Sequence, residues 1–273
     1  MLGFVLLAVL GLAVGSFLNV VAYRVPLGLS VVSPPSSCPG CGHEITARDN
    51  IPLMSWLMLR GKCRHCAEPI SPRYIVVEAL TGAAFVAVAL YLLPDVLTAD
   101  TVRAGVAASL VLVAFLYLAA ITVALTAIDL DVHRLPNRIV LPSYAVGAVL
   151  LSAAAIVGGD LEAGARAAAG AGILAVFYLV LALAKPGGMG LGDVKLAGVL
   201  GLYLGYLGWA PLIAGAFGAF LLGGLFAVGV LIVRRGGRGP GIPFGPWMFA
   251  GAWLGIFGGE QLVAAYLTAV GLS

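Results

Sequence analysis

The chain alternates long apolar runs with short polar segments. Eight of the runs are long enough, or nearly so, to predict membrane-spanning helices, because about 20 residues of helix cross the hydrocarbon core of a bilayer. They cover residues 2–23, 74–93, 104–128, 139–157, 164–184, 194–207, 209–233 and 245–270. The sixth run is short and rich in glycine, so it is predicted to be a half-span or a tilted helix.

Composition supports this interpretation. Hydrophobic residues make up 62% of the chain and charged residues only 10%, whereas soluble domains are about a quarter charged. The 38 glycines suit close helix packing in lipid. No basic segment precedes residues 2–23 and no small-residue cleavage site follows them, so we expect a retained first helix. The prediction is an all-α polytopic membrane protein with about eight transmembrane helices.

The basic residues predict the orientation of these spans. If residues 24–73 lie in the cytoplasm and the chain alternates from there, every Lys and Arg except Arg103 and Arg166 falls on the cytoplasmic side. The cytoplasmic set includes the cluster Arg234, Arg235 and Arg238. The net charge of +3 follows from this sorting, so it gives no reason to expect a nucleic acid partner.

All the cysteines lie in the one sizeable polar segment, residues 24–73. They form two C-x-x-C pairs, Cys38 with Cys41 and Cys63 with Cys66. Two such pairs can complete a tetrahedral site of four thiolates, which is closed and therefore structural. A cytoplasmic location disfavours disulfides. A segment this short builds little core, so a bound zinc ion would supply folding energy. Iron or a redox pair remains an alternative, and the neighbouring His43 and His65 are not needed as ligands.

Two aspartates stand at the predicted cytoplasmic membrane edge. Asp129 ends the third run and Asp193 starts the sixth. Carboxylates at bilayer depth are costly and usually functional. A close carboxylate pair can divide the roles of general base and general acid, as aspartyl proteolysis requires. Asp193 alone could merely cap its helix, but a helix C-terminus disfavours the charge of Asp129.

Other carboxylates and other chemistries are weaker candidates. Asp131 is the rival partner in the pair and is expected beyond the helix end, in a solvated ion pair. Glu78, inside the second run, could face the same site or pair with an arginine. No G-x-S-x-G motif is present, and "GMGLGDVKL" (188–196) completes neither a dinucleotide-binding nor a P-loop motif.

Five stretches in order resemble the bacterial type IV prepilin peptidase family, membrane aspartyl proteases with a glycine-x-glycine-aspartate signature. The resemblance covers nearly the whole chain, and its motifs are "GSFLNVVAYRVP" (15–26), the cysteine segment (38–74), "IDLDVHRLPN" (128–137), "GMGLGDVKLAGVLG" (188–201) and "IPFGPWMFAGAW" (242–253).

The resemblance implies an activity and site residues. Asp129 and Asp193 match the family's catalytic aspartates, and Cys38, Cys41, Cys63 and Cys66 match its zinc ligands. Family members cut type IV prepilins and secretion pseudopilins after a glycine, which releases a short basic leader at the cytoplasmic face of the bacterial inner membrane. Many then methylate the new N-terminus with S-adenosylmethionine as the methyl donor, although no residue of this chain can be named for that step.

The expected organisation has three parts. Residues 1–23 form the first transmembrane helix, residues 24–73 a small cytoplasmic zinc-ribbon-like domain, and residues 74–273 the transmembrane protease domain. Gly190 and Gly192 are expected to let the backbone at the active site approach a substrate peptide. A transporter, or a scaffold with a regulatory zinc ribbon, is the alternative, although no inverted repeat of broken helices marks a transporter.

Overall fold

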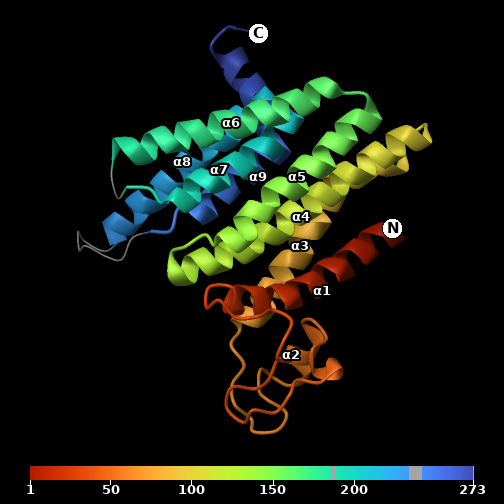
Figure 1. Ribbon diagram of the computed structural model, residues 1–273, viewed down its shortest axis with the longest axis vertical. Helices are drawn as coiled ribbons and strands as arrows, with labels where there is room; N and C mark the ends of the chain where they lie inside the picture. Colours follow the sequence, from red (N-terminus) through yellow and green to blue (C-terminus); the bar gives the residue numbers. More distant parts are fainter. Residues whose placement is uncertain (186–187, 234–241, 273) are drawn as a thin grey trace. The chain divides into compact units, whose positions relative to one another are not determined.

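The described chain is entirely helical apart from loops and two isolated β-bridges. A computed structural model describes residues 1–185, 188–233 and 242–272, so Arg234, Arg235 and Arg238 lie outside the described residues. The helices are α1 (Leu2–Arg24), η1 (Ala47–Asp49), α2 (Met54–Met58), α3 (Arg73–Leu97), α4 (Val102–Val132), α5 (Asn137–Gly158), α6 (Leu161–Ala184), α7 (Leu191–Leu207), α8 (Trp209–Val233) and α9 (Gly245–Ala269) (Figure 1).

Six of the described helices, α1, α3, α4, α5, α6 and α8, are long and apolar enough to cross a membrane. The predicted all-α fold with several membrane spans is therefore confirmed. α7 has only 17 residues, and in α9 glycines, tryptophans and the polar pair Glu260–Gln261 dilute the apolar run. Crossing by α7 and α9, and hence the count of eight, stays a prediction.

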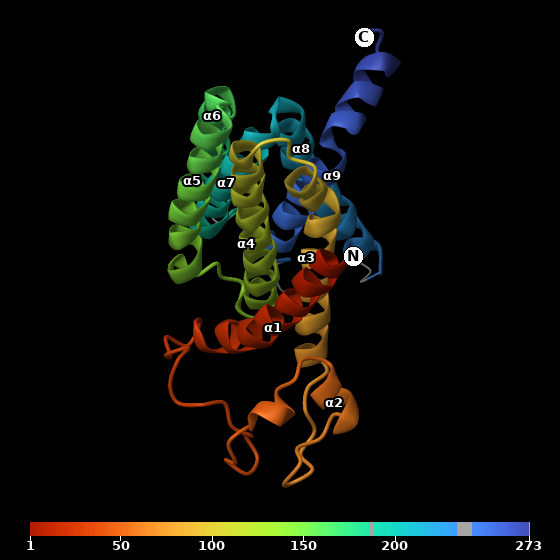
Figure 2. The same cartoon turned by 90° about the vertical axis from the view of Figure 1, so that its right-hand side faces the viewer.

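The chain divides into two compact units, to each of which α4 contributes a part. The first contains Met1–Pro94 and Phe115–Ile128. Within it, α1 packs on α3 through small residues, since a Cβ at Gly15 would lie 2.7 Å from the Cα of Glu78 and a Cβ at Gly11 2.8 Å from Phe85. Figure 2 shows the cysteine-bearing loop, with α2, at one end of these two helices.

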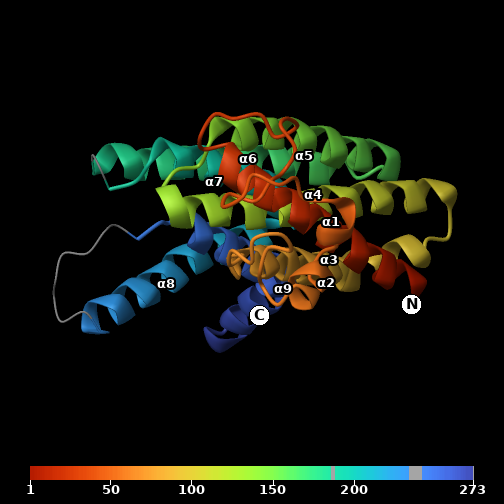
Figure 3. The ribbon, with the colours of Figure 1, turned by 90° about the horizontal axis from the view of Figure 1, so that it is seen from below.

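The second unit contains Asp95–Ala114 and the described residues from Asp129 onward. Glycines allow its helices to meet backbone to backbone. A Cβ at Gly205 would lie 2.5 Å from the Arg166 carbonyl oxygen, which brings α7 onto α6 (Figures 1 and 3). A Cβ at Gly255 would lie 2.5 Å from the Pro211 carbonyl oxygen, which brings α9 onto α8. The glycine content thus serves close helix packing, as the composition suggested.

The C-terminal end of α4 differs from the sequence-based boundary in a way that matters for the carboxylates. α4 continues to Val132 and ends where His133 takes a left-handed backbone conformation, φ 51°. Asp131 therefore lies inside the helix, and its expected place beyond the helix end was wrong. The apolar run ends at Ile128 because polar residues follow it. The backbone nevertheless stays helical to Val132, since polar residues are tolerated at a helix end that reaches water.

Candidate active site and metal centre

Asp129 lies near the C-terminal end of α4 and is almost fully buried, with 5% of its surface exposed. Its Oδ2 accepts a hydrogen bond of 3.0 Å from the backbone N–H of Gly245, the first residue of α9. The N-terminus of a helix carries unpaired N–H groups and a partial positive charge. The start of α9 therefore stabilises the negative charge of Asp129, which the C-terminus of α4 disfavours.

Asp193 lies in the first turn of α7, where its Oδ2 accepts a 3.0 Å hydrogen bond from the N–H of Gly190. The same helix start is tied to α5, because Lys195 donates from Nζ to the Asn137 side-chain oxygen at 3.0 Å. Tyr144 also donates to the Lys195 carbonyl oxygen at 2.6 Å. Asp193 thus caps its own helix, at a helix start that is held by two further side chains.

The two aspartates belong to the same compact unit. The negative charge of Asp129 acts on the Asp193 carboxyl group. Leu135, buried in the loop after α4, links their surroundings: its Cβ lies 3.1 Å from the Cβ position of Gly192, and its Cδ2 lies 3.4 Å from that of Gly245. The ends of α4, α7 and α9 thus place the carboxyl groups of Asp129 and Asp193 within range of each other's charge.

The two glycines of the predicted active-site loop have separate roles in this packing. A Cβ at Gly192 would crowd Leu135 at 3.1 Å, and a Cβ at Gly190 would approach the Asp193 carboxylate at 3.3 Å. Neither has a left-handed backbone, since Gly190 has φ −78° and Gly192 lies within α7 and has no positive φ. Close approach, rather than an unusual conformation, accounts for glycine at both positions.

Several residues near the pair were missed by the sequence reasoning. Gly245 lies within the quoted motif "IPFGPWMFAGAW" but received no role. Leu135 lies within "IDLDVHRLPN" and was also passed over. Tyr178 of α6 is buried and lies within range of the charge of Asp193. Its ring packs with Phe220 and Phe244 at centroid distances of 5.4 and 6.3 Å. For Gly245 and Leu135, the only sequence signal was the motif that contains each residue. Tyr178 had none, because it is a single tyrosine in an apolar run.

Glu78 and Asp131 take other places. Glu78, buried in α3, accepts a 2.8 Å hydrogen bond from the backbone N–H of Leu53 in the cysteine-bearing loop. Asp131 is exposed on the end of α4. The structure thus gives Glu78 a partner in the loop backbone, a role that the sequence reasoning had not considered.

The four cysteines form one cluster. Their Sγ atoms all lie within 4.8 Å of one another, and those of Cys38 and Cys66 are 3.7 Å apart. Zinc–sulfur bonds of about 2.3 Å in a tetrahedron place the sulfurs ~3.8 Å apart, so the cluster fits a zinc ion. Hydrogen bonds from the backbone N–H groups of Cys66 and His65 lower the pKa of the Cys63 thiol to about 7. Burial and the neighbouring thiols raise the pKa of Cys66 to about 12, so Cys63 forms a thiolate before Cys66 does.

The two knuckles repeat one backbone pattern. In the first, the Cys38 N–H bonds the His43 carbonyl and the Gly42 N–H bonds the Cys38 carbonyl. In the second, Cys63 bonds Glu68 and Ala67 bonds Cys63 at the same spacings. Gly42 and Ala67, the equivalent fourth residues after each cysteine, both have positive φ, 69° and 59°. The repeat indicates that each pair of cysteines is held by its own turn.

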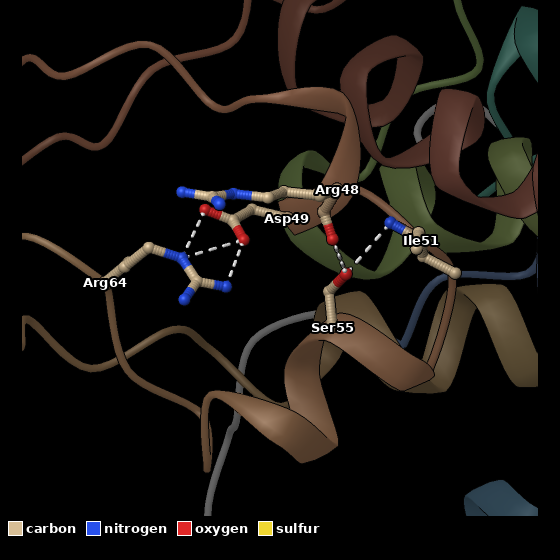
Figure 4. Close-up of polar contacts among 5 residues, drawn as sticks. All are labelled: Arg48, Asp49, Ile51, Ser55 and Arg64. Atoms are coloured by element: carbon tan, nitrogen blue, oxygen red, sulfur yellow. Dashed lines mark hydrogen bonds and ion pairs between the residues drawn. The ribbon is translucent and has the colours of Figure 1, made fainter.

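Side chains around the cluster connect parts of the cysteine-bearing loop to one another. Arg64 contacts Asp49 through Nε and Nη2 at 2.6–3.0 Å, which joins the second knuckle to η1 and lowers the pKa of Asp49 (Figure 4). Ser55 of α2 donates to the Arg48 carbonyl at 2.9 Å and accepts from the Ile51 N–H at 3.0 Å. The rings of His43 and His65 lie with centroids 3.6 Å apart and are tilted by 36° to each other.

Comparison with known proteins places both regions in one family. Residues 9–92 match the family model for the bacterial peptidase A24 N-terminal domain, and residues 115–228 match that for the type IV leader peptidase family. Similar curated proteins are named prepilin leader peptidase/N-methyltransferase. The protein from Aeromonas hydrophila is 36% identical over 97% of this chain and 94% of its own length. The protein from Pseudomonas aeruginosa is 33% identical over 99% and 96%. No solved structure matches the chain.

Proposed function

The chain belongs to the type IV prepilin leader peptidase/N-methyltransferase family, and we propose on that premise that it is an aspartyl endopeptidase acting on type IV prepilins and pseudopilins. In this proposal it cuts the peptide bond after a glycine and releases the short basic leader. It then methylates the amine that the cut exposes.

The observation that supports the peptidase activity is that Asp129 and Asp193 lie close enough for their charges to interact. Each carboxylate has one oxygen held by a backbone N–H group, at 3.0 Å in both cases. In the proposed reaction one carboxylate takes a proton from water while the other, protonated, gives its proton to the carbonyl oxygen. The first carboxyl group then passes the proton that it took from water to the leaving amine. The water oxygen bonds the glycine carbonyl carbon to form a tetrahedral diol. The diol then collapses, which breaks the carbon–nitrogen bond and returns one hydroxyl proton to the second carboxylate, so the hydrolysis is balanced. This chemistry needs neither a nucleophilic side chain nor a metal.

The place of the pair suits a helical membrane substrate. Both aspartates lie at helix ends, Asp129 near the end of α4 and Asp193 at the start of α7. We assign this end to the cytoplasmic edge of the bacterial inner membrane, with α7 and α9 completing eight crossings. A pilin precursor, an apolar helix with a basic cytoplasmic leader, would then present its cleavage site at the level of the pair.

The cysteine cluster is assigned a zinc ion with a structural role. Cys38, Cys41, Cys63 and Cys66 would hold the ion, which when bound supplies the folding energy that a loop with little core lacks. We take residues 24–73 as a cytoplasmic zinc-binding domain, residues 1–23 as the first transmembrane helix and residues 74–273 as the protease domain. S-adenosylmethionine is the proposed methyl donor, because the curated relatives are named as N-methyltransferases.

Mass spectrometry of a purified reaction tests both activities. The protein in detergent is incubated with a pilin precursor, with and without S-adenosylmethionine. We expect a mass loss equal to the leader in both reactions and a further gain of one methyl group only with the donor. An unchanged precursor would refute the peptidase assignment and leave the transporter or scaffold alternative. Cleavage without the added methyl group would refute the methyltransferase assignment alone.

A further inference from the structure

Two groups beside the carboxylate pair have no part in the proton transfers described above. They are the backbone amide of Gly245, at the start of α9, and the side chain of Leu135, in the loop between α4 and α5. We propose that Gly245 and Leu135 are positioning residues that fix the Asp129 carboxylate relative to Asp193. This inference rests on the proposed peptidase function.

Gly245 holds Asp129 closely in two ways. Its N–H donates to Oδ2 at 3.0 Å across 116 residues of chain. A Cβ at the same residue would lie only 2.7 Å from that oxygen. Any side chain at this position therefore pushes the carboxylate away from its donor. Glycine permits the approach because it alone has no Cβ.

Leu135 separates the two helix starts that bear on the pair. Its Cβ lies 3.1 Å from the Cβ position of Gly192 on α7, and its Cδ2 lies 3.4 Å from that of Gly245 on α9. A Cβ at Gly192 would therefore crowd Leu135 and one at Gly245 would be in ordinary van der Waals contact with it, and Leu135 is 9% exposed. A leucine held on both sides acts as a spacer that keeps the starts of α7 and α9 at a fixed separation.

Displacement of a catalytic group by about 1 Å is enough to lower a rate ~100-fold, because the reacting atoms must meet in a narrow range of geometries. Loss of positioning should therefore reduce kcat while substrate still binds. Loss of folding would instead reduce the amount of active enzyme and the thermal stability. These different signatures separate a positioning role from a purely structural one.

The first test compares Gly245→Ala with Gly258→Ala. Gly258 lies on the same helix, and a Cβ there would meet only Leu262 of its own helix, at 4.0 Å. We expect Gly245→Ala to lower kcat at least tenfold with KM within twofold of the wild type. Its thermal unfolding temperature in detergent should match that of the Gly258→Ala control, which should keep full activity.

The second test uses Leu135→Ala and Leu135→Met, and it decides the proposal if Gly245→Ala proves unstable. Methionine keeps the side-chain volume, whereas alanine leaves the space between Gly192 and Gly245 open. We expect Leu135→Ala to lower kcat at least tenfold and Leu135→Met to restore it to within threefold of the wild type.

The outcomes separate this inference from the function on which it rests. If the wild-type protein does not cut the precursor, the proposed function fails. If the wild type cuts and stable Gly245→Ala has the kcat of Gly258→Ala, the positioning role of Gly245 is overturned. If Leu135→Ala likewise keeps its kcat, the spacer role of Leu135 is overturned as well.

Discussion

The hydrogen bond from Leu53 to Glu78 predicts a measurable loosening of the cysteine-bearing loop when the carboxylate is removed. Leu53 is a non-glycine residue at φ 59°, a conformation that L-residues avoid because of crowding at Cβ. Its N–H is bound at 2.8 Å by a carboxylate that is 8% exposed. Glu78→Ala leaves this N–H without its acceptor and the turn without its anchor.

The magnitude follows from the type of bond. A hydrogen bond to a charged acceptor contributes about 1.5–3 kcal/mol. Because about 1.4 kcal/mol corresponds to a factor of ten, we expect the Leu53 amide of Glu78→Ala to exchange its hydrogen ~10–100-fold faster. Glu78→Gln keeps a side-chain oxygen in the same place, so its Leu53 amide should exchange at an intermediate rate.

Hydrogen exchange resolved to single residues by mass spectrometry is the assay. The Cys38 amide, which bonds the His43 carbonyl in the first knuckle, is the internal reference and should be unchanged. Exchange at Leu53 within twofold of the wild type in Glu78→Ala would refute the reasoning. Equal acceleration at Leu53 and Cys38 would also contradict it, because it would mean that the whole loop had opened.

Two further predictions concern the metal and the helix packing. Removal of zinc by a chelator, or Cys38→Ser, should make the loop between α1 and α3 sensitive to protease, because metal binding supplies about 10–16 kcal/mol in comparable small zinc domains. Elemental analysis should find one zinc per chain, and its absence would contradict this. Gly251→Ala should lower the free energy of unfolding by about 1–3 kcal/mol through overpacking, since a Cβ there would lie 2.6 Å from the Gly215 carbonyl oxygen. Thermal unfolding in detergent measures the loss, and Gly258→Ala is the control that should show none.

Helix positions could be predicted from the sequence because membrane spans are long and apolar. The predicted run 209–233 coincides with α8, Trp209–Val233. Helix ends were harder, since hydropathy reports where apolar residues stop and not where the backbone turns. α4 continues through Asp129 and Asp131 until His133 adopts a left-handed conformation, and no local pattern marked that residue.

The candidate site was found from side-chain chemistry, and its supports were missed because they are backbone or apolar groups. Asp129 stood out since nothing near it in sequence favours a carboxylate. Its partner is an amide N–H of Gly245, 116 residues away. Any residue except proline offers such a group, so the sequence could not single it out. Leu135 likewise resembles any apolar residue until its two neighbours are known.

The same limit applies to the cysteine-bearing loop. The paired spacing of Cys38, Cys41, Cys63 and Cys66 was sufficient to predict a four-sulfur cluster, because each C-x-x-C turn places two thiolates together. The anchor of the loop on Glu78 was not predictable, since a carboxylate and the backbone of Leu53 meet only after folding. The spacing of the cysteines thus predicts the metal ligands, whereas the contact that holds their loop on α3 is known only from the fold.

The most direct test of the central claim is leader release by the purified variants Asp129→Asn, Asp193→Asn and Asp131→Asn, followed by mass spectrometry of a pilin precursor. Asparagine keeps the shape of the side chain but can neither accept nor give the required proton. We predict that Asp129→Asn and Asp193→Asn leave the precursor intact, while Asp131→Asn releases the leader as the wild type does. Leader release at the wild-type rate by either Asp129→Asn or Asp193→Asn would contradict the account.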